Sequence, residues 1–248
     1  MMIKKQLLIF SLFIGFSLSA QKNYYELRTY ELKFGSSQQA FHDYVSKALI
    51  PKLNKNGVEK VGVFSEYGDP TPTVIRILIP YRNTAHHAEV MELMGKDEAF
   101  AALRADYDKI PVEKAVYNRY STSFFTAFDG LPTLVAPQED ATIYELRTYE
   151  GYSEDAVRRK VKMFNTYEFE IFDNTGLHSV FFGEQVAGPN MPALTYMLSF
   201  TSMEARDANW DKFRVHPLWQ KISKMEEFAN SVSNIQRNFL EALPYSQL

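Results

Sequence analysis

Hydrophobic residues recur along the chain with a period of two in short segments and of three to four in longer ones. Residues 25–31, YELRTYE, are rich in aromatic types and predict a strand. Apolar residues then follow at helical spacing from Phe41 to Leu53, and Gly57 supplies a C-terminal stop. The elements expected next are strands at 61–66 and 74–79, a helix around 85–107 and a strand at 115–121. The first part of the chain therefore has the order βαββαβ.

The same order occurs a second time because the chain contains an internal repeat. YELRTYE recurs without a change at residues 144–150, an offset of 119 residues. In this copy Ser153 is the expected N-cap of a helix that stops at Gly176. The elements expected next are strands at 179–184 and 194–200, a helix over 204–230 that Pro217 should break, and a strand at 235–240. The halves are thus expected to be two copies of one domain.

A stretch between the copies contains Gly130, Pro132 and Pro137 and has no sustained helical periodicity. We therefore expect four segments, which are a signal peptide at 1–20, a first domain at 21–128, a linker at 129–141 and a second domain at 142–248. The order βαββαβ is that of a ferredoxin-like unit, whose four-stranded antiparallel sheet carries both helices on one face. Because a bare apolar sheet face is costly, we expect an α+β fold in which two tandem ferredoxin-like domains pack sheet to sheet as a pseudo-dimeric α+β barrel.

Several of these segments resemble the NIPSNAP family. The similarity rests on YELRTYELKFG at residues 25–35 and its second copy, on residues 180–184 and 188–198, and on residues 210–219, which hold WDKF and HPLW. It covers almost the whole chain after residue 20. The resemblance implies the dimeric α+β barrel fold and a largely unassigned activity, and it supplies no catalytic residues to transfer.

The first twenty residues have the pattern of a secretory signal. Lys4 and Lys5 precede an apolar run of about twelve residues, which ends near Ser19 and Ala20. A membrane-spanning helix needs ~20 apolar residues, so we expect cleavage after Ala20, or after Ser19, and no stable membrane anchor afterwards. The chain has no cysteine for a lipid anchor. The expected location of the mature protein is the periplasm or the extracellular space.

Composition narrows the chemistry further. The absence of cysteine excludes disulfides, thiolate metal sites and cysteine nucleophiles. The chain has 27 basic and 30 acidic side chains, and this balance argues against a nucleic-acid partner. The sequence contains no nucleotide-binding loop, GxSxG elbow or histidine-based metal motif, so we expect neither a cofactor nor a metal ion.

Alternation along the repeated strand groups its polar side chains. Glu26, Arg28 and Tyr30 share one face, and so do their equivalents in the second copy. If Leu27 points toward the helices, these side chains line the barrel interior, where arginine offers a rigid fork of donors to a carboxylate or enol. The alternative is an ion pair that only satisfies the sheet. The candidate ligand-binding residues are Glu26, Arg28, Tyr30, Glu145, Arg147, Tyr149 and Tyr196.

His178, which begins a strand, is the candidate general base near neutral pH. Aromatic residues around Trp210 and several methionines make the second half the favoured place for a ligand. We expect a protein that binds a small, partly apolar molecule between its two sheets. The alternatives are a cofactor-independent monooxygenase or isomerase, by analogy with other α+β barrels, and a non-catalytic structural or partner-binding module. The duplication permits a monomer with pseudo-twofold symmetry or a homodimer.

Overall fold

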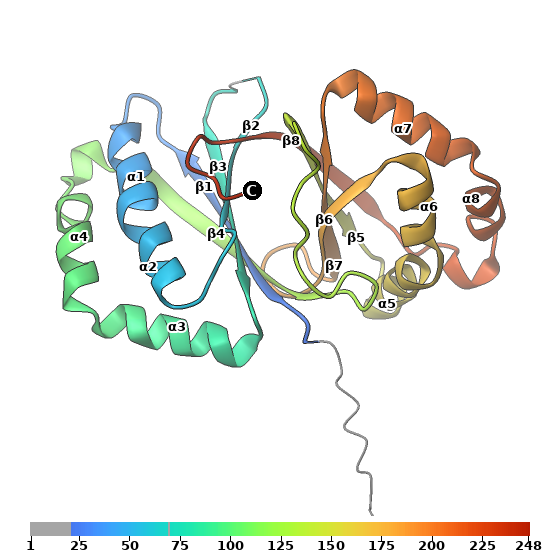
Figure 1. Ribbon diagram of the computed structural model, residues 1–248, viewed down its shortest axis with the longest axis horizontal. Helices are drawn as coiled ribbons and strands as arrows, with labels where there is room; N and C mark the ends of the chain where they lie inside the picture. Colours follow the sequence, from blue (N-terminus) through green and yellow to red (C-terminus); the bar gives the residue numbers. More distant parts are fainter. Residues whose placement is uncertain (1–20, 69) are drawn as a thin grey trace, which may run out of the picture.

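The strands of the protein form one closed barrel in a computed structural model that describes residues 21–68 and 70–248 (Figure 1). The predicted signal peptide lies outside the described residues. Within them, no helix combines the length and the apolar character that crossing a bilayer requires.

The first half contains four strands and four helices in the predicted order. Its elements are β1 (Tyr24–Leu32), α1 (Gln38–Tyr44), a π-helical turn η1 (Val45–Leu49), α2 (Ile50–Lys55), β2 (Gly62–Glu66), β3 (Val74–Tyr81), α3 (Thr84–Lys96), α4 (Glu98–Asp108), a 3-10 turn η2 (Val112–Lys114) and β4 (Tyr117–Ala127).

The second half repeats this plan. Its elements are β5 (Ile143–Glu150), α5 (Glu154–Met163), a π-helical turn η3 (Phe164–Glu168), α6 (Phe169–Thr175), β6 (His178–Ala187), β7 (Ala193–Phe200), α7 (Met203–Val215), α8 (Pro217–Ile222), a 3-10 turn η4 (Glu226–Phe228) and β8 (Asn234–Ala242). The two π-helical turns start exactly one repeat apart, so even this irregularity is duplicated.

Helix ends follow the local signals in the sequence. The Ser153 side chain accepts a hydrogen bond from the Ala156 amide at the start of α5, and Gly176 ends α6 with φ = 76°. The helix expected over residues 85–107 is instead two helices, because Asp97 is extended and its side chain caps α4. Pro217 begins α8 and breaks the last long helix as predicted.

Each half forms a four-stranded antiparallel sheet, and the two sheets share their edges. The strand order around the barrel is β1-β3-β2-β8-β5-β7-β6-β4. Within each half the order is that of a ferredoxin-like unit, and β2 pairs with β8 while β4 pairs with β6 across the two seams. Closure removes all edge strands, which satisfies backbone groups that an open sheet would expose. The predicted α+β barrel is confirmed.

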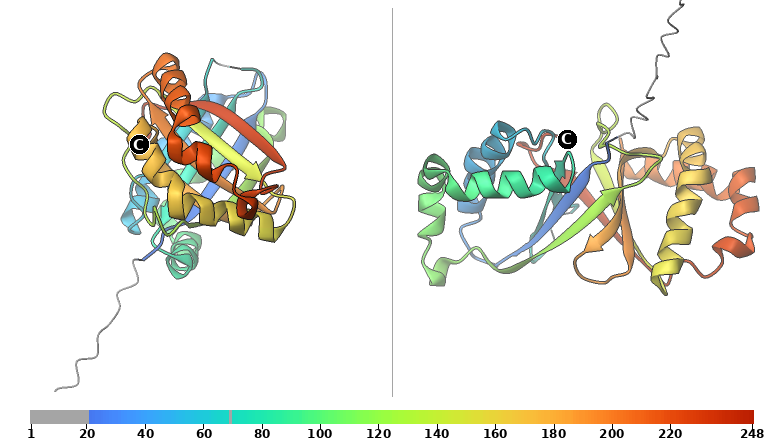
Figure 2. Two further views of the ribbon diagram at one scale, coloured as in Figure 1. Left: turned by 90° about the vertical axis from the view of Figure 1, so that its right-hand side faces the viewer. Right: turned by 90° about the horizontal axis from the view of Figure 1, so that it is seen from below.

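The helices lie outside this barrel on two opposite sides. Helices α1–α4 cover the strands of the first half and α5–α8 cover those of the second, with the strands between the two layers (Figures 1 and 2). Each strand therefore has one face toward the barrel interior and one toward its own helices. The described residues accordingly form three hydrophobic cores, one inside the barrel and one under each helical layer.

The barrel interior is filled with apolar side chains. Leu27 and its equivalent Leu146 point inward, together with the buried residues Tyr25, Phe64, Leu78, Phe125, Ala127, Leu134, Tyr144, Val180, Phe181, Met197 and Leu240. Leu134 comes from the segment that connects the halves, and its amide donates a hydrogen bond to Asn23 Oδ1 over 2.9 Å. The space between the two sheets is thus a packed core where the sequence led us to expect a cavity.

The assignment of strand faces made from the sequence was therefore wrong. Glu26, Arg28 and Tyr30 face the helices of the first half, and the equivalent residues of β5 face those of the second. The reason is physical: both faces of a barrel strand are buried, so alternation separates two sets of side chains without indicating which set lies inside. Aromatic and aliphatic residues fill the interior. On the other face Glu145 pairs with Arg206 and Trp210 of α7. Glu26 pairs with Arg28 of its own strand and with Tyr81 of β3.

Candidate functional site

A cavity of about 370 Å³ lies between the helix-facing side of the first sheet and helices α3 and α4. Strand β1 contributes Arg28 and Tyr30, which the sequence singled out. The other residues that line it are Tyr44, Met91, Met94, Gly95, Phe100, Arg104, Tyr107, Asp108, Tyr117 and Tyr120. The cavity combines aromatic and thioether surfaces with two guanidinium groups, which suits a small, partly apolar molecule.

Arg28 is held rigidly at this cavity by Glu26. Its Nε donates to Glu26 Oε1 over 2.6 Å and its Nη2 to Oε2 over 3.1 Å, a bidentate pair in which Nη1 takes no part. Tyr81 Oη donates a further hydrogen bond to Glu26 Oε2 over 3.0 Å. Burial alone would lower the pKa of Arg28, but the neighbouring Glu26 carboxylate outweighs it and the pKa is raised. The guanidinium is therefore charged, and within residues 21–68 and 70–248 no hydrogen bond from its Nη1 is seen.

Five of the twelve residues that line the cavity are tyrosines. Tyr44 and Tyr107 stack with ring centroids 4.3 Å apart, and Tyr30 stacks on Tyr120 at 4.7 Å. Burial raises the pKa of Tyr30, Tyr44 and Tyr107, so their hydroxyls stay protonated at neutral pH. The site therefore offers neutral O–H groups, which donate or accept, beside the charged Arg28.

Arg104 lies at the rim, where α4 passes over the cavity. Its Nε and Nη2 donate to the Asp108 carboxylate over 2.7 and 3.0 Å, and this pair is about 40% exposed. An exposed ion pair of this kind contributes little to stability. Arg104 can therefore reorient at small cost.

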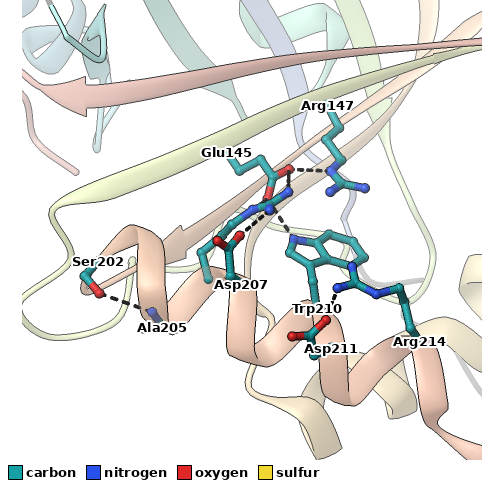
Figure 3. Close-up of polar contacts among 9 residues, drawn as sticks. Glu145, Arg147, Ser202, Ala205, Asp207, Trp210, Asp211 and Arg214 are labelled. Carbon is teal, nitrogen blue, oxygen red and sulfur yellow. Dashed lines mark hydrogen bonds and ion pairs between the residues drawn. The ribbon is translucent and has the colours of Figure 1, made fainter.

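The equivalent carboxylate of the second half lies at the centre of a dense polar cluster. Glu145 is fully buried and accepts from Arg147 Nε over 2.7 Å and from Trp210 Nε1 over 2.8 Å. Arg206 adds two hydrogen bonds, of 2.8 and 3.0 Å. Figure 3 shows the Glu145 carboxylate bonded to both Arg147 and Trp210, with the indole beside the guanidinium. Burial opposes ionisation of Glu145, but its hydrogen bonds to Arg206 and the charge of Arg147 lower its pKa.

The remaining candidates of the second half are also packed. The Arg147 guanidinium lies 3.7 Å from the centroid of the Trp210 ring, and its Nη1 donates to Tyr149 Oη over 3.3 Å. Tyr149 Oη lies 2.9 Å from Tyr196 Oη, and Tyr196 stacks on Phe182 at 4.7 Å. The sequence favoured the second half for a ligand, but these side chains are held within its core. The cavity beside the repeated arginine belongs to the first half.

A comparison of the two halves explains this difference. Arg28 pairs with Ile77 across the sheet, and Arg147 pairs with Tyr196, so the strands align at the same offset of 119 residues. Helices α3 and α7 align at this offset too, which places Met91 where the second half has Trp210. In the same way Phe100 corresponds to Trp219. Smaller side chains in the first copy leave space that larger ones fill in the second.

One buried ion pair was missed at the sequence level. Lys160 of α5 and Glu168 of η3 form a salt bridge with both side chains less than 10% exposed. The Lys160 ammonium also lies 4.5 Å from the centroid of the Phe164 ring. The only signal in the sequence was a pair of charged residues eight positions apart within an apolar helical stripe.

His178 forms its hydrogen bond with the segment that connects the two halves. Its Nε2 lies 2.9 Å from the carbonyl oxygen of Ala136, an acceptor, so the ring donates this hydrogen bond and holds the connecting segment against β6. It lines a separate surface pocket of about 310 Å³ with Asp173 and Gln138. In residues 21–68 and 70–248, no three His, Asp or Glu side chains gather in a way that could hold a metal ion.

The fold and the duplicated strand define a dimeric α+β barrel built from two ferredoxin-like units. A NIPSNAP family model matches residues 25–115 and 144–247, so the chain belongs to the NIPSNAP family. A search of curated proteins found no match.

Solved structures share the fold over almost the full chain. A putative monooxygenase from Lactobacillus acidophilus is 12% identical, with a TM-score of 0.57 over 89% of this chain and 94% of that chain. One from Fusobacterium nucleatum is 13% identical, with a TM-score of 0.55 over 90% and 94%. A mutant chlorite dismutase from Candidatus Nitrospira defluvii is 8% identical, with a TM-score of 0.56 over 92% and 93%. At these identities the similarity shows the fold alone.

Proposed function

We propose that this NIPSNAP protein binds a small, partly apolar molecule in the cavity between the first sheet and helices α3 and α4. The observation that carries the proposal is the cavity of about 370 Å³ with Arg28 in its wall. Arg28 is charged, held by Glu26 and still has Nη1 for a further acceptor. A pre-positioned polar donor beside apolar side chains in a concave site is typical of small-molecule sites.

The chemistry of the lining restricts the ligand. Each arginine is paired with a carboxylate, so the cavity has no excess positive charge that a highly charged anion would need. Its protonated tyrosine hydroxyls and the guanidinium favour a carbonyl, phenol, enol or single carboxylate oxygen. Met91, Met94 and Phe100 favour an apolar body.

We further propose that binding takes place after export. The support is the N-terminal pattern of Lys4, Lys5, an apolar run and Ser19-Ala20, which is typical of a secretory signal. Expression in the native host, cell fractionation and N-terminal sequencing test this part. Export predicts a mature chain that begins at Gln21 or Ala20 outside the cytoplasm, and an intact Met1 in the cytoplasm contradicts it.

Native mass spectrometry of the protein purified from its own cells tests the binding proposal. A reproducible small-molecule adduct is expected on the wild type and should be lost from Arg28→Met. The matched control is Arg119→Met, which removes an exposed arginine from β4 of the same sheet and should keep the adduct. The proposal is refuted if Arg28→Met and Arg119→Met carry the same amount of adduct. It is also refuted if the folded wild type carries no adduct when it is mixed with metabolites extracted from the native host at high micromolar concentration.

A second candidate function is a cofactor-independent monooxygenase. The specific observation is that two full-length fold neighbours are described as putative monooxygenases. In such a reaction the substrate itself supplies the electrons: an activated CH₂ becomes C=O, one oxygen atom enters the product and the other leaves as water. An oxygen electrode, with the molecule identified by mass spectrometry as substrate, tests this idea. Oxygen uptake that is lost in Arg28→Met supports a monooxygenase. If no oxygen is consumed, the monooxygenase is ruled out and the binding function stands.

A further inference from the structure

The second half shows how the repeated arginine of this fold holds an aromatic ring. The Arg147 guanidinium lies 3.7 Å from the centroid of the Trp210 ring, which is the geometry of a cation–π contact (Figure 3). Trp210 Nε1 also donates to Glu145 Oε2 over 2.8 Å. The indole thus makes two contacts, one between its face and Arg147 and one between its N–H group and Glu145.

The first half has the same arginine and lacks the ring. Helices α3 and α7 both have 13 residues, and each is capped by a side chain that accepts from an amide three residues later, Asn83 in α3 and Ser202 in α7. Met91 and Trp210 are both the eighth residue of their helix. Met91 and Arg28 both line the cavity, which therefore lies beside the position that corresponds to the indole.

In the first half another donor makes the hydrogen bond that the Trp210 indole makes in the second half. Within the described residues, no aromatic side chain takes the place of the indole ring. Glu26 accepts from Tyr81 Oη over 3.0 Å. At the matching position the second half has Phe200, which carries no hydroxyl, and there Glu145 accepts from Trp210. Glu26 therefore needs no donor from a ligand. In the part of the chain that the structure describes, no aromatic ring makes a cation–π contact with Arg28, whereas Trp210 makes one with Arg147.

We propose that the first-half cavity takes a flat aromatic ring stacked on Arg28, in the place that the Trp210 indole occupies against Arg147. An acceptor oxygen of the same molecule lies toward Arg28 Nη1 and the tyrosine hydroxyls. The inference rests on the proposed binding function and names the ligand class, a planar aromatic compound with a phenol, carbonyl or carboxylate oxygen. Tyr30 and Tyr120, which stack on each other, add flat aromatic surface to the lining of the same cavity.

Calorimetric titration of the full protein with 2-naphthoate and with decahydro-2-naphthoate tests the inference. The two probes share a carboxylate and a carbon skeleton, and only the first is flat and aromatic. The wild type should bind 2-naphthoate about tenfold more tightly, because a desolvated cation–π contact is worth ~1–2 kcal/mol and ~1.4 kcal/mol is tenfold.

Three variants locate the ring. Met91→Trp places an indole where the second half has one and should weaken binding of 2-naphthoate at least tenfold. Leu93→Trp is the matched control on the same helix, because Leu93 is exposed, and it should bind like the wild type. Arg28→Lys keeps the positive charge without the flat guanidinium and should reduce the preference for the aromatic probe, which keeps the test valid if Met91→Trp does not fold.

The outcomes separate the inference from the function on which it rests. Equal affinities for the two probes, or unchanged binding in folded Met91→Trp, overturn the stacked ring. Binding of neither probe also overturns it. The binding function itself survives these results if native mass spectrometry finds an adduct that depends on Arg28, and it fails with them if no such adduct exists.

Discussion

Replacing Glu145 by glutamine removes one negative charge from the middle of a buried cluster and keeps the size of the side chain. Glu145 accepts four hydrogen bonds of 2.7–3.0 Å from Arg147, Arg206 and Trp210. Glutamine has a single acceptor oxygen, and its NH₂ group must face donors on the other side. Two arginines then remain side by side without a buried carboxylate between them.

The expected loss of stability is about 3–5 kcal/mol, because breaking a buried ion pair by removing one partner leaves an uncompensated buried charge. Arg206 keeps its contact with the more exposed Asp207, which holds the loss within this range. For a protein of this size 1 kcal/mol corresponds to about 2–4 °C, so the melting temperature should fall by about 6–20 °C.

The same cluster gives the stability a pH dependence. The pKa of Glu145 is lowered in the folded state, so its contribution is present above the unfolded value of 4.5 and is lost as the pH falls through the folded value. The free energy of unfolding of the wild type should therefore fall below about pH 4.5. In Glu145→Gln this acid limb should be shallower.

Urea unfolding followed by circular dichroism measures both effects, at pH 7 and along the acid limb. The control is Glu92→Gln, which removes one partner of an exposed pair with Lys96 and should change stability by less than about 0.5 kcal/mol. A Glu145→Gln protein within about 1 kcal/mol of the wild type at pH 7 would show that the cluster does not hold the second half together.

Three further changes probe other parts of the structure. Arg147→Met should cost about 1.5–3 kcal/mol in urea unfolding and leave any native adduct in place, and loss of the adduct would contradict the assignment of the site to the first half. Gly183→Ala should cost about 1–3 kcal/mol in a thermal melt, since a Cβ there would lie 2.5 Å from the Cβ of Phe125 across the β4–β6 seam, and an unchanged melt would argue against this close seam. Hydrogen bonds from Lys52 and a backbone amide lower the pKa of Asp97 to about 2, so its contribution is lost as the pH falls from about 4 to 2. In Asp97→Asn the denaturant midpoint should change less with pH over that interval than in the wild type. The same pH dependence in both proteins would refute the role of the Lys52–Asp97 pair.

Much of the fold follows from local features that the sequence states directly. The repeat of YELRTYE and the period of the apolar residues identified both copies and their βαββαβ order. Ser153, Gly176 and Pro217 marked helix ends because capping and chain breaking depend on one residue and its neighbours. The break at Asp97 was missed, since apolar periodicity continues across it and only the cap shows that the helix restarts.

The site was predicted in part. The polar set of the repeated strand was identified by its residues, and two of its members, Arg28 and Tyr30, line the cavity. The other lining residues come mainly from α3, α4 and β4, where they look like ordinary core positions of helices and strands. His178 was chosen for its chemistry alone, and the structure gives it a carbonyl partner in the connecting segment.

The sequence by itself determined the duplication, the elements, the fold family and the grouping of Glu26, Arg28 and Tyr30 on one face, because these depend on short-range periodicity and on identical residues one repeat apart. Only the tertiary structure decided which face that is and which copy is open. In β1 and β5 side chains of both faces are buried, so side-chain packing settles the first question. The second depends on a contact between a strand and a helix distant in sequence: Trp210 covers Arg147, whereas Met91 leaves the side of Arg28 open to a cavity.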